Sequence, residues 1–491
     1  MSSERDSDSI LLGKGPPLEV FDTLPSVEEH FTTPKITLFH RLFRIFGPGV
    51  IMLGAAIGSG ELLLGPNQML LHGMGILWIV GVSILLQVFF NYGWGKWTLA
   101  TGESPLVSFR RIGKWMLVAG LVVAWLGLGW PGWAATAATV FASLQLGRIP
   151  VAADAGMVHM WGYVFLILSF VMLAVGRRIA RTLELFNWVA IIVFFAFFFL
   201  ANLIFSSPQH WAEGIAGYLN FGYIPKDMDI TMLGAIVGYA GLATGINLFA
   251  INYYRDKGYG AGASAGYLPA LVGGRRVPVP AAGRLMRLTP ENLRRFKKWQ
   301  SLLVQEQVFI FGLGSLVAFL LPGLLITALL PKGALPDASS VATYLVNALI
   351  KNLGPVGLAF GLVIVILVLV KSQICFSDML VRNTTEVLWQ IPKVREWAKE
   401  DIRRVYYLIL IVLLIWVAIA LTLAEPIWLI VTSANMTNLG AIVTVPTLLY
   451  LNRKLPKELR MSWPVEVVQI IFMIFCMYFF FSVIGAMAGI L

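Results

Sequence analysis

Residues 46–72 read FGPGVIMLGAAIGSGELLLGPNQMLLH. The stretch is long and apolar enough to cross a membrane, which takes about 20 residues. Gly54, Gly58 and Gly60 interrupt it, and Glu61 lies near its middle. Glycine weakens a helix, and a carboxyl group is costly in hydrocarbon. The pattern predicts a discontinuous helix that lines a site. Close packing through small residues is the alternative, but it leaves Glu61 unexplained.

The rest of the chain supplies ten more apolar runs. Of its 491 residues, 58% are hydrophobic and 13% charged, and the mean hydropathy is +0.78. A soluble domain carries about 25% charged residues. The runs are continuous rather than alternating, which favours helices over a barrel. The predicted spans are 46–72, 75–99, 115–145, 158–176, 183–205, 230–252, 302–329, 353–378, 404–423, 427–451 and 465–489.

The distribution of Lys and Arg predicts an orientation. If the N-terminus is cytoplasmic, all but four of the 37 Lys and Arg residues fall on the cytoplasmic side. The exceptions are Arg148, Lys226, Lys332 and Lys351. We therefore expect an integral, multi-pass protein of the plasma (inner) membrane, with the lipid bilayer as its surroundings. The net charge of +11 does not indicate a nucleic-acid partner, because the basic residues lie between apolar spans rather than in one patch.

Two polar segments lie outside the spans. Residues 1–45 have no long apolar core of the kind that a signal peptide carries, and we expect a mostly disordered cytoplasmic tail. The predicted cytoplasmic loop 253–300 is irregular at first. Thr289-Pro290-Glu291 then reads as the start of a helix, which we expect to be amphipathic, to lie at the cytoplasmic surface and to lead into the seventh span.

The interruption seen in the first span recurs five spans later. Gly241 and Gly245 break the run 230–252, with Thr244 and Asn247 beside them. Paired broken spans in corresponding positions indicate an inverted-repeat transporter with its site between them. The predicted fold is an all-α polytopic membrane protein of the leucine-transporter type. Its first repeat is 46–205, its second 230–451, and its last span falls in 465–491.

Further polar residues lie inside spans eight and ten. Lys371 follows an apolar run, and it either snorkels to the cytoplasmic surface or compensates charge where a sodium ion would sit between spans one and eight. Ser433 and Asn435 lie in span ten, where they either bond neighbouring helices or bind the cargo. No nucleophile–base pair, Walker A sequence or deeply placed histidine is present. We therefore expect neither an enzyme nor a bound cofactor.

The chain resembles the Nramp (natural resistance-associated macrophage protein) family of divalent-metal transporters over roughly residues 40–490. Eleven spans and a cytoplasmic N-terminus match that family. The similar stretches are Gly47-Pro48-Gly49 through Glu61 to Leu64, Leu77-Trp78, Thr101-Gly102, Asn247-Leu248-Phe249 and Pro446.

The metal-binding signatures of the family are altered here. Its first-helix signature, Asp-Pro-Gly-Asn, reads Gly58-Ser59-Gly60-Glu61, and its sixth-helix Met-Pro-His reads Thr244-Gly245-Ile246. The tenth-helix Gln position falls roughly at Ser433. Without sulfur or imidazole the site should not favour Mn²⁺ or Fe²⁺, whereas oxygen ligands suit Mg²⁺ or Ca²⁺. The remaining oxygen donors are Glu61, Ser59, Thr244, backbone carbonyls and Asn435.

We therefore predict a secondary transporter, proton-coupled as a symporter, that moves a divalent cation with Glu61 as the metal ligand or proton carrier. A small organic solute is the first alternative, and a membrane sensor or scaffold the second. The oligomeric state stays open. The predicted substrate-binding residues are Gly58, Ser59, Gly60, Glu61, Thr244, Gly245, Asn247, Ser433 and Asn435, with Lys371 as the charge-compensating residue.

Overall fold

The computed structural model describes residues 9–33, 36–332 and 338–489. These residues form eleven helical segments that are long and apolar enough to cross a membrane, as the sequence predicted. The ends of the predicted N-terminal tail (1–8) and of the last predicted segment (490–491) lie outside the described residues.

The first five spans lie between residues 48 and 205. Span one is α3 (Pro48–Ala56), a π-helical turn η3 (Gly60–Leu64) and α4 (Gly65–His72). The others are η4 with α5 (Met74–Ile76, Leu77–Thr101), α7 with α8 (Lys114–Leu128, Gly132–Leu146), η6 with α9 (Ala152–Asp154, Ala155–Ala174) and α10 (Ile179–Phe205). The short helices of this half are α6 (Pro105–Ser108), η5 (Phe109–Arg111) and α11 (Pro208–Gly217).

Spans six to ten follow, and the first of them is again discontinuous. Span six is α12 (Ile230–Tyr239), the 3-10 segment η7 (Thr244–Ala250) and α13 (Asn252–Lys257). Spans seven to ten are α14–η9–α15 (Pro290–Gln305, Glu306–Gly312, Leu313–Leu329), α17–η11–α18 (Pro355–Val365, Ile366–Val370, Lys371–Leu388), α20 (Ile402–Ala420) and α21 (Pro426–Lys454). Span eleven is α22 (Trp463–Met487), and the connecting helices are η8 (Gly260–Ser264), η10 (Ala338–Ser340), α16 (Val341–Leu353), α19 (Pro392–Trp397) and η12 (Lys457–Leu459).

Burial separates the central spans from the peripheral ones. The most apolar part of span one is entirely buried and that of span six is 94% buried, whereas that of span eleven is 28% buried. Within the core, α12 packs against α21, and α3 packs against α10 and α18. Spans one and six therefore form the centre of the molecule, and span eleven lies at its periphery.

The N-terminal segment is ordered where it is described, so the expectation of a mostly disordered tail is wrong for residues 9–33. Strand β1 (Ser9–Ile10) pairs antiparallel with β2 (Leu18–Phe21), and β2 pairs in parallel with β3 (Arg284–Met286) of the long loop. Helix α1 (Val27–His30) follows with a capping box at Ser26, and α2 (Leu38–His40) and the π turn η2 (Arg41–Ile45) lead into span one. The sequence gives no local sign of this pairing, because its partner lies far along the chain.

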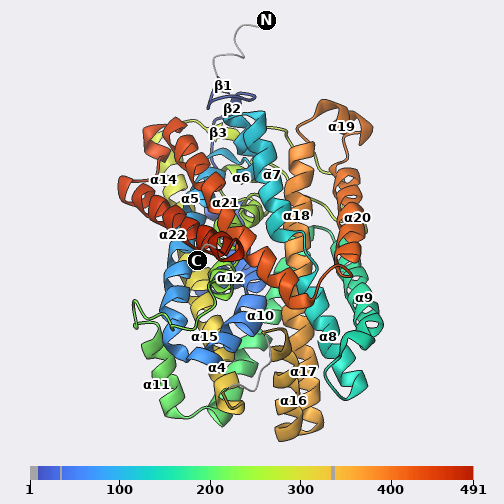
Figure 1. Ribbon diagram of the computed structural model, residues 1–491. Helices are drawn as coiled ribbons and strands as arrows, with labels where there is room; N and C mark the ends of the chain where they lie inside the picture. The colour runs from blue at the N-terminus through green and yellow to red at the C-terminus, as the bar shows by residue number, and fades with distance from the viewer. Residues whose placement is uncertain (1–8, 34–35, 333–337, 490–491) are drawn as a thin grey trace, which may run out of the picture.

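Helix α14 begins at Pro290, where the sequence predicted a helix, and leads through the π-helical segment η9 into α15 of span seven. Its apolar face, which includes Trp299, packs against the N-terminal segment, and the Trp299 indole donates to the carbonyl of Pro25 at 2.9 Å. The predicted cytoplasmic segments, marked by β1, α14 and α19, gather at one end of the molecule in Figure 1, and α11 and α16 lie at the other. Which end faces the cytoplasm stays a prediction.

Candidate functional site

Span one is discontinuous at the position that the glycines predicted. Helix α3 ends at Ala56, Ile57 leaves the helical conformation with φ −59° and ψ 85°, and the π turn η3 begins at Gly60. A residue in that conformation cannot continue the backbone hydrogen bonds of α3. The break therefore frees backbone amides and carbonyls in the buried centre of the protein.

Span six is broken at the matching place. Helix α12 ends at Tyr239, Gly241 takes a left-handed φ of 80°, and the chain turns again at Thr244. The two breaks touch, because a Cβ atom on Gly60 would lie 2.1 Å from the carbonyl oxygen of Tyr239. Glycine at position 60 thus permits an approach that other residues would prevent.

The Glu61 carboxylate joins the two breaks. Its side chain is fully buried, with one oxygen accepting from the Gly58 amide and the other from the Gly241 amide, each at 3.2 Å. A buried carboxylate needs such donors, since desolvation would otherwise be prohibitive. One side chain therefore binds the backbone of both broken spans.

Lys371 does not snorkel. It is 1% exposed, and its ammonium donates to the carbonyls of Gly54 and, at 3.0 Å, Ile57. The neighbouring Ser372 hydroxyl donates to the same Ile57 carbonyl at 3.2 Å. The ammonium interacts electrostatically with Glu61, but its hydrogen bonds are to span one. The ammonium of span eight thus lies against carbonyls at the end of α3, the N-terminal half of span one, which is here called its inner half.

The other residues predicted at the breaks bind nearby polar groups. The Ser59 hydroxyl accepts from the indole of Trp133 at 3.1 Å. Thr244 donates to the carbonyl of Val237 at 2.6 Å, and Asn247 accepts from the Ala243 amide at 2.7 Å. Thr244 and Asn247 therefore form hydrogen bonds with backbone groups on either side of the break in span six. Gly245 packs against α21, where a Cβ atom would lie 2.3 Å from the Ala441 amide nitrogen.

A residue that we did not predict at the site, Gln87 of α5, supports the break in span six. Its side-chain oxygen accepts from Asn247 at 2.8 Å and from the Leu242 amide at 3.3 Å, and its amide group donates to the Ala240 carbonyl. The sequence feature that could have identified Gln87 is that it is the one Gln within the apolar run 75–99. Its partners lie in another span, which sequence spacing does not reveal.

Span ten contributes unevenly. Ser433 pairs with the hydroxyl of Tyr239, beside the break, and donates to the Gly127 carbonyl at 2.7 Å. Asn435 donates to the Thr231 carbonyl at 3.1 Å, near the start of α12. The structure therefore brings Ser433 to the site but places Asn435 with the beginning of α12, away from Glu61. The interpretation of Asn435 as an interhelical hydrogen-bonding residue describes it better than a role as a ligand.

Aromatic side chains lie beside the breaks. The Trp133 ring stacks on Phe376 with 4.4 Å between the ring centroids, and it lies 5.5 Å from the Tyr239 ring. These rings come from spans three, six and eight, and Trp133 also binds Ser59. The site is thus polar on the side of Glu61 and aromatic on the side of Ser59.

No group of three or more His, Cys, Asp or Glu side chains that could hold a metal ion occurs in the part of the chain that the structure describes. A metal ion at the two breaks would therefore have Glu61 as its charged ligand, with neutral oxygen atoms completing its coordination.

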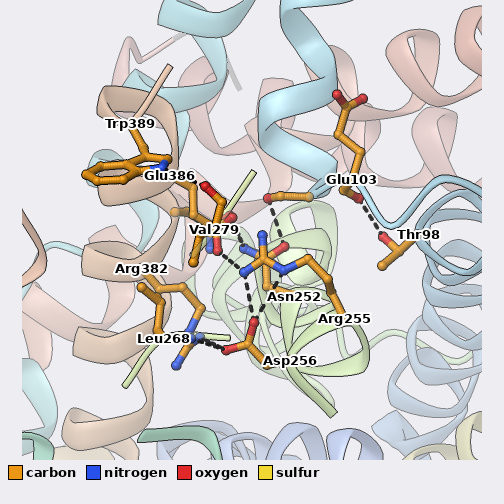
Figure 2. A network of polar contacts seen from close by, with 12 residues as sticks. Thr98, Glu103, Asn252, Arg255, Asp256, Leu268, Val279, Arg382, Glu386 and Trp389 are labelled. Carbon is orange, nitrogen blue, oxygen red and sulfur yellow. Dashed lines mark hydrogen bonds and ion pairs between the residues drawn. The ribbon is translucent and has the colours of Figure 1, made fainter. Parts of the chain in front are cut away.

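A buried charge network connects α13 with α18 (Figure 2). Arg382 and Arg255 both bind Asp256, and Arg255 also binds Glu386. Asn252 donates to Glu386 at 2.9 Å. The two guanidinium groups thus compensate the charge of the buried Asp256 carboxylate. The network keeps the end of span six attached to span eight.

Together, the two broken spans, the carboxylate between them and the eleven spans define an integral multi-pass membrane protein with the leucine-transporter-type inverted-repeat fold. No protein-family model and no curated protein matches the chain. A crystal structure of a variant of the Eremococcus coleocola manganese transporter is similar, with a TM-score of 0.61 and 15% sequence identity over 94% of this chain and 92% of that one.

Two further solved structures are similar at lower TM-scores. One is Mhp1, a nucleobase-cation-symport-1 family transporter in a closed conformation with bromovinylhydantoin bound, at a TM-score of 0.49 and 13% identity over 90% of this chain and 91% of that one. The other is MhsT in complex with L-phenylalanine, at a TM-score of 0.45 and 14% identity over 90% and 99%.

Proposed function

We propose that this protein is a secondary transporter that works by alternating access around Glu61. The observation that carries the proposal is the position of the Glu61 carboxylate, which binds an amide of each broken span. When one repeat moves against the other, those two amides separate, and the carboxylate must exchange a ligand. Such a group couples the binding of a cargo or a proton to the movement.

As the cargo we propose a small neutral or zwitterionic organic solute rather than a divalent cation. Glu61 and Lys371 together carry no net charge, so a divalent cation would experience the repulsion of the ammonium in a medium that screens charges poorly. The stacked rings of Trp133 and Phe376 add an apolar wall that suits an organic group. In this proposal a solute would bind its polar groups at the breaks and its apolar part against the rings.

The coupling ion in this proposal is a proton. The Lys371 ammonium already binds the Gly54 and Ile57 carbonyls, which a sodium ion would otherwise use. Transport would therefore be independent of sodium. In this proposal Glu61 takes up and releases the proton beside the cargo, and the protein works as a proton-coupled symporter.

A divalent cation is the second candidate cargo. It is favoured by the all-oxygen surroundings of Glu61, by the fold similarity to a manganese transporter and by the resemblance to the Nramp family. Glu61, Ser59 and Thr244 would then be the side-chain ligands, and Mg²⁺ or Ca²⁺ the preferred ions.

The test is uptake into proteoliposomes of purified protein, with and without an inward pH gradient. One arm uses Mg²⁺, Ca²⁺ and Mn²⁺, and the other uses a panel of labelled amino acids and other small zwitterions. Each arm compares the wild type with Glu61→Gln and with Glu466→Gln as the matched control. Glu466 belongs to α22, where it binds Asn452.

We expect saturable uptake of an organic solute that the pH gradient accelerates and that sodium does not affect. Glu61→Gln should reduce gradient-driven uptake by at least about tenfold, because the variant cannot exchange a proton, while Glu466→Gln should resemble the wild type. Saturable divalent uptake that is lost in Glu61→Gln would establish the second candidate. If folded protein transports neither class, the proposal fails and the sensor or scaffold alternative gains support.

A further inference from the structure

Span seven carries another fully buried carboxyl group, Glu306, at the end of span one where α3 begins. One of its oxygens accepts from the Gly47 amide at 2.7 Å and from the Gly49 amide at 2.8 Å. Its other oxygen accepts from the hydroxyl of Tyr259 at 3.2 Å. Here these four residues are called the Glu306 cluster, and they attach the first turn of α3 to span seven and to the loop after α13.

The Glu306 cluster explains why positions 47 and 49 are glycines. A Cβ atom on Gly49 would lie 2.5 Å from Cγ of Glu306, and a Cβ atom on Gly47 would lie 2.4 Å from the ammonium nitrogen of Lys257. Both glycines thus let side chains of other spans reach the amides that begin α3. Those amides have no partner within the helix, and a carboxylate also suits the positive end of the helix dipole.

Glu306 begins the π-helical segment η9, which interrupts span seven. Segments of this kind are rare and often occur at functional positions, because they cost stability compared with a regular helix. The next residue, Gln307, bonds Asn91 of span two at 3.0 Å and the hydroxyl of Tyr254 in α13 at 2.9 Å. The π segment therefore presents two adjacent polar side chains to spans one, two and six.

The opposite side of α3 borders an open cavity of about 520 Å³. Pro48 and Ile51 line it from span one, Glu184 from α10 and Lys257 from α13, and residues 30–32 of the N-terminal segment complete its wall. The inner half of span one thus has a polar attachment to Glu306 on one side and the cavity on the other. On the cavity side the Lys257 ammonium donates to the Phe46 carbonyl at 3.3 Å and pairs with Glu184 at 2.9 Å. A helix in this position can move only after the attachment breaks.

We propose that Glu306 is a positioning residue that holds the inner half of span one in the closed position and releases it when the transporter opens toward the end that carries the N-terminus. This inference rests on the proposed function. Movement of α3 into the cavity would separate the Gly47 and Gly49 amides from the carboxylate. It would also shift the Gly54 and Ile57 carbonyls relative to Lys371, which links the cluster to the central site.

The test measures the accessibility of two single cysteines to a membrane-impermeant maleimide in vesicles that expose the N-terminal end. Ile51→Cys reports on the inner half of span one, and Leu70→Cys reports on its outer half; both positions are buried. The native Cys375 and Cys476 are fully buried, and the parent protein corrects for their labelling. Each reporter is combined with Glu306→Gln, with Gly49→Ala, and with Gly156→Ala as the control, since nothing lies within 4 Å of a Cβ at Gly156.

We expect Glu306→Gln and Gly49→Ala to raise the labelling rate of Ile51→Cys by about tenfold, as the loss of one charge-assisted hydrogen bond implies. Leu70→Cys should label at the unchanged rate, and Gly156→Ala should change neither. Equal acceleration at both reporters would mean general loosening and would overturn the inference, as would no acceleration at Ile51→Cys. Gly49→Ala provides the answer if Glu306→Gln does not fold. Labelling needs no cargo, so this test can succeed or fail independently of the uptake assay for the proposed function.

Discussion

Glu61 and Lys371 are opposite charges in the centre of the protein, and each is held mainly by backbone groups of a broken helix. A direct ion pair would neutralise both groups and leave the break unsatisfied. Here the carboxylate takes up free amides, and the ammonium takes up free carbonyls. The two side chains therefore stabilise the break itself, and they are available to change partners when it moves.

The role of Lys371 predicts a gain of sodium binding. In Lys371→Ala the Gly54 and Ile57 carbonyls lose their cation, and a sodium ion can replace it beside the Ser372 hydroxyl. We expect about 100 mM NaCl to raise the melting temperature of this variant by a few degrees over the same concentration of choline chloride. The wild type should show no difference between the two salts. A Lys371→Ala protein that is equally stable in both salts would contradict this role.

At the scale of the element, the contact between the two breaks depends on one small residue. Gly60 lies against the carbonyl of Tyr239, and Gly241 supplies the left-handed turn that follows. The glycines of spans one and six thus serve both of the functions that the sequence suggested. Some expose backbone at the breaks, and others, such as Gly245, allow close packing.

Gly60→Ala should push the two broken spans apart. Its Cβ atom would overlap the Tyr239 carbonyl, and a misplaced methyl group of this kind costs about 1–3 kcal/mol. We expect a lower melting temperature together with the loss of uptake, measured by thermal unfolding in detergent and in proteoliposomes. Gly156→Ala, at a helical glycine with no neighbour within 4 Å, should leave both unchanged. A fully active Gly60→Ala protein would show that the breaks do not need this contact.

At the scale of the whole molecule, the two ends differ in composition. The end with the N-terminal sheet, α14 and α19 carries the predicted cytoplasmic segments (Figure 1). The N-terminal segment and α14 are also joined by an ion pair between Arg295 and Glu29 at 2.9 Å. Such an assembly of long polar segments belongs in water, and its excess of Lys and Arg favours the cytoplasm.

The predicted orientation can be tested with exposed lysines at opposite ends. Lys297→Cys of α14 and Lys226→Cys, in the segment before α12, replace exposed side chains. In intact cells, an impermeant maleimide should label Lys226→Cys and leave Lys297→Cys unlabelled until the membrane is permeabilised. The reverse pattern would show that the protein has the opposite orientation, and it would contradict the inference from the Lys and Arg distribution. Labelling of both in intact cells would mean that the protein inserts in two orientations.

Hydrophobicity and glycine content were sufficient to predict the eleven spans, the two breaks and the central place of Glu61. These features are local, since a run of apolar residues or a cluster of glycines acts through the chain beside it. The alternation of Lys- and Arg-rich segments with segments poor in them can likewise be read along the chain, without knowing how the helices pack. The fold class therefore came from the sequence pattern.

Contacts between distant segments were decided only by the tertiary structure. The sequence pattern did not place Gln87 beside span six, Glu306 beside Gly47 and Gly49, or β2 beside β3, and it grouped Asn435 with a site from which the helix packing separates it. Which buried donor meets which acceptor depends on how helices rotate and cross. That arrangement comes from packing all eleven spans at once, and no short stretch of the chain encodes it.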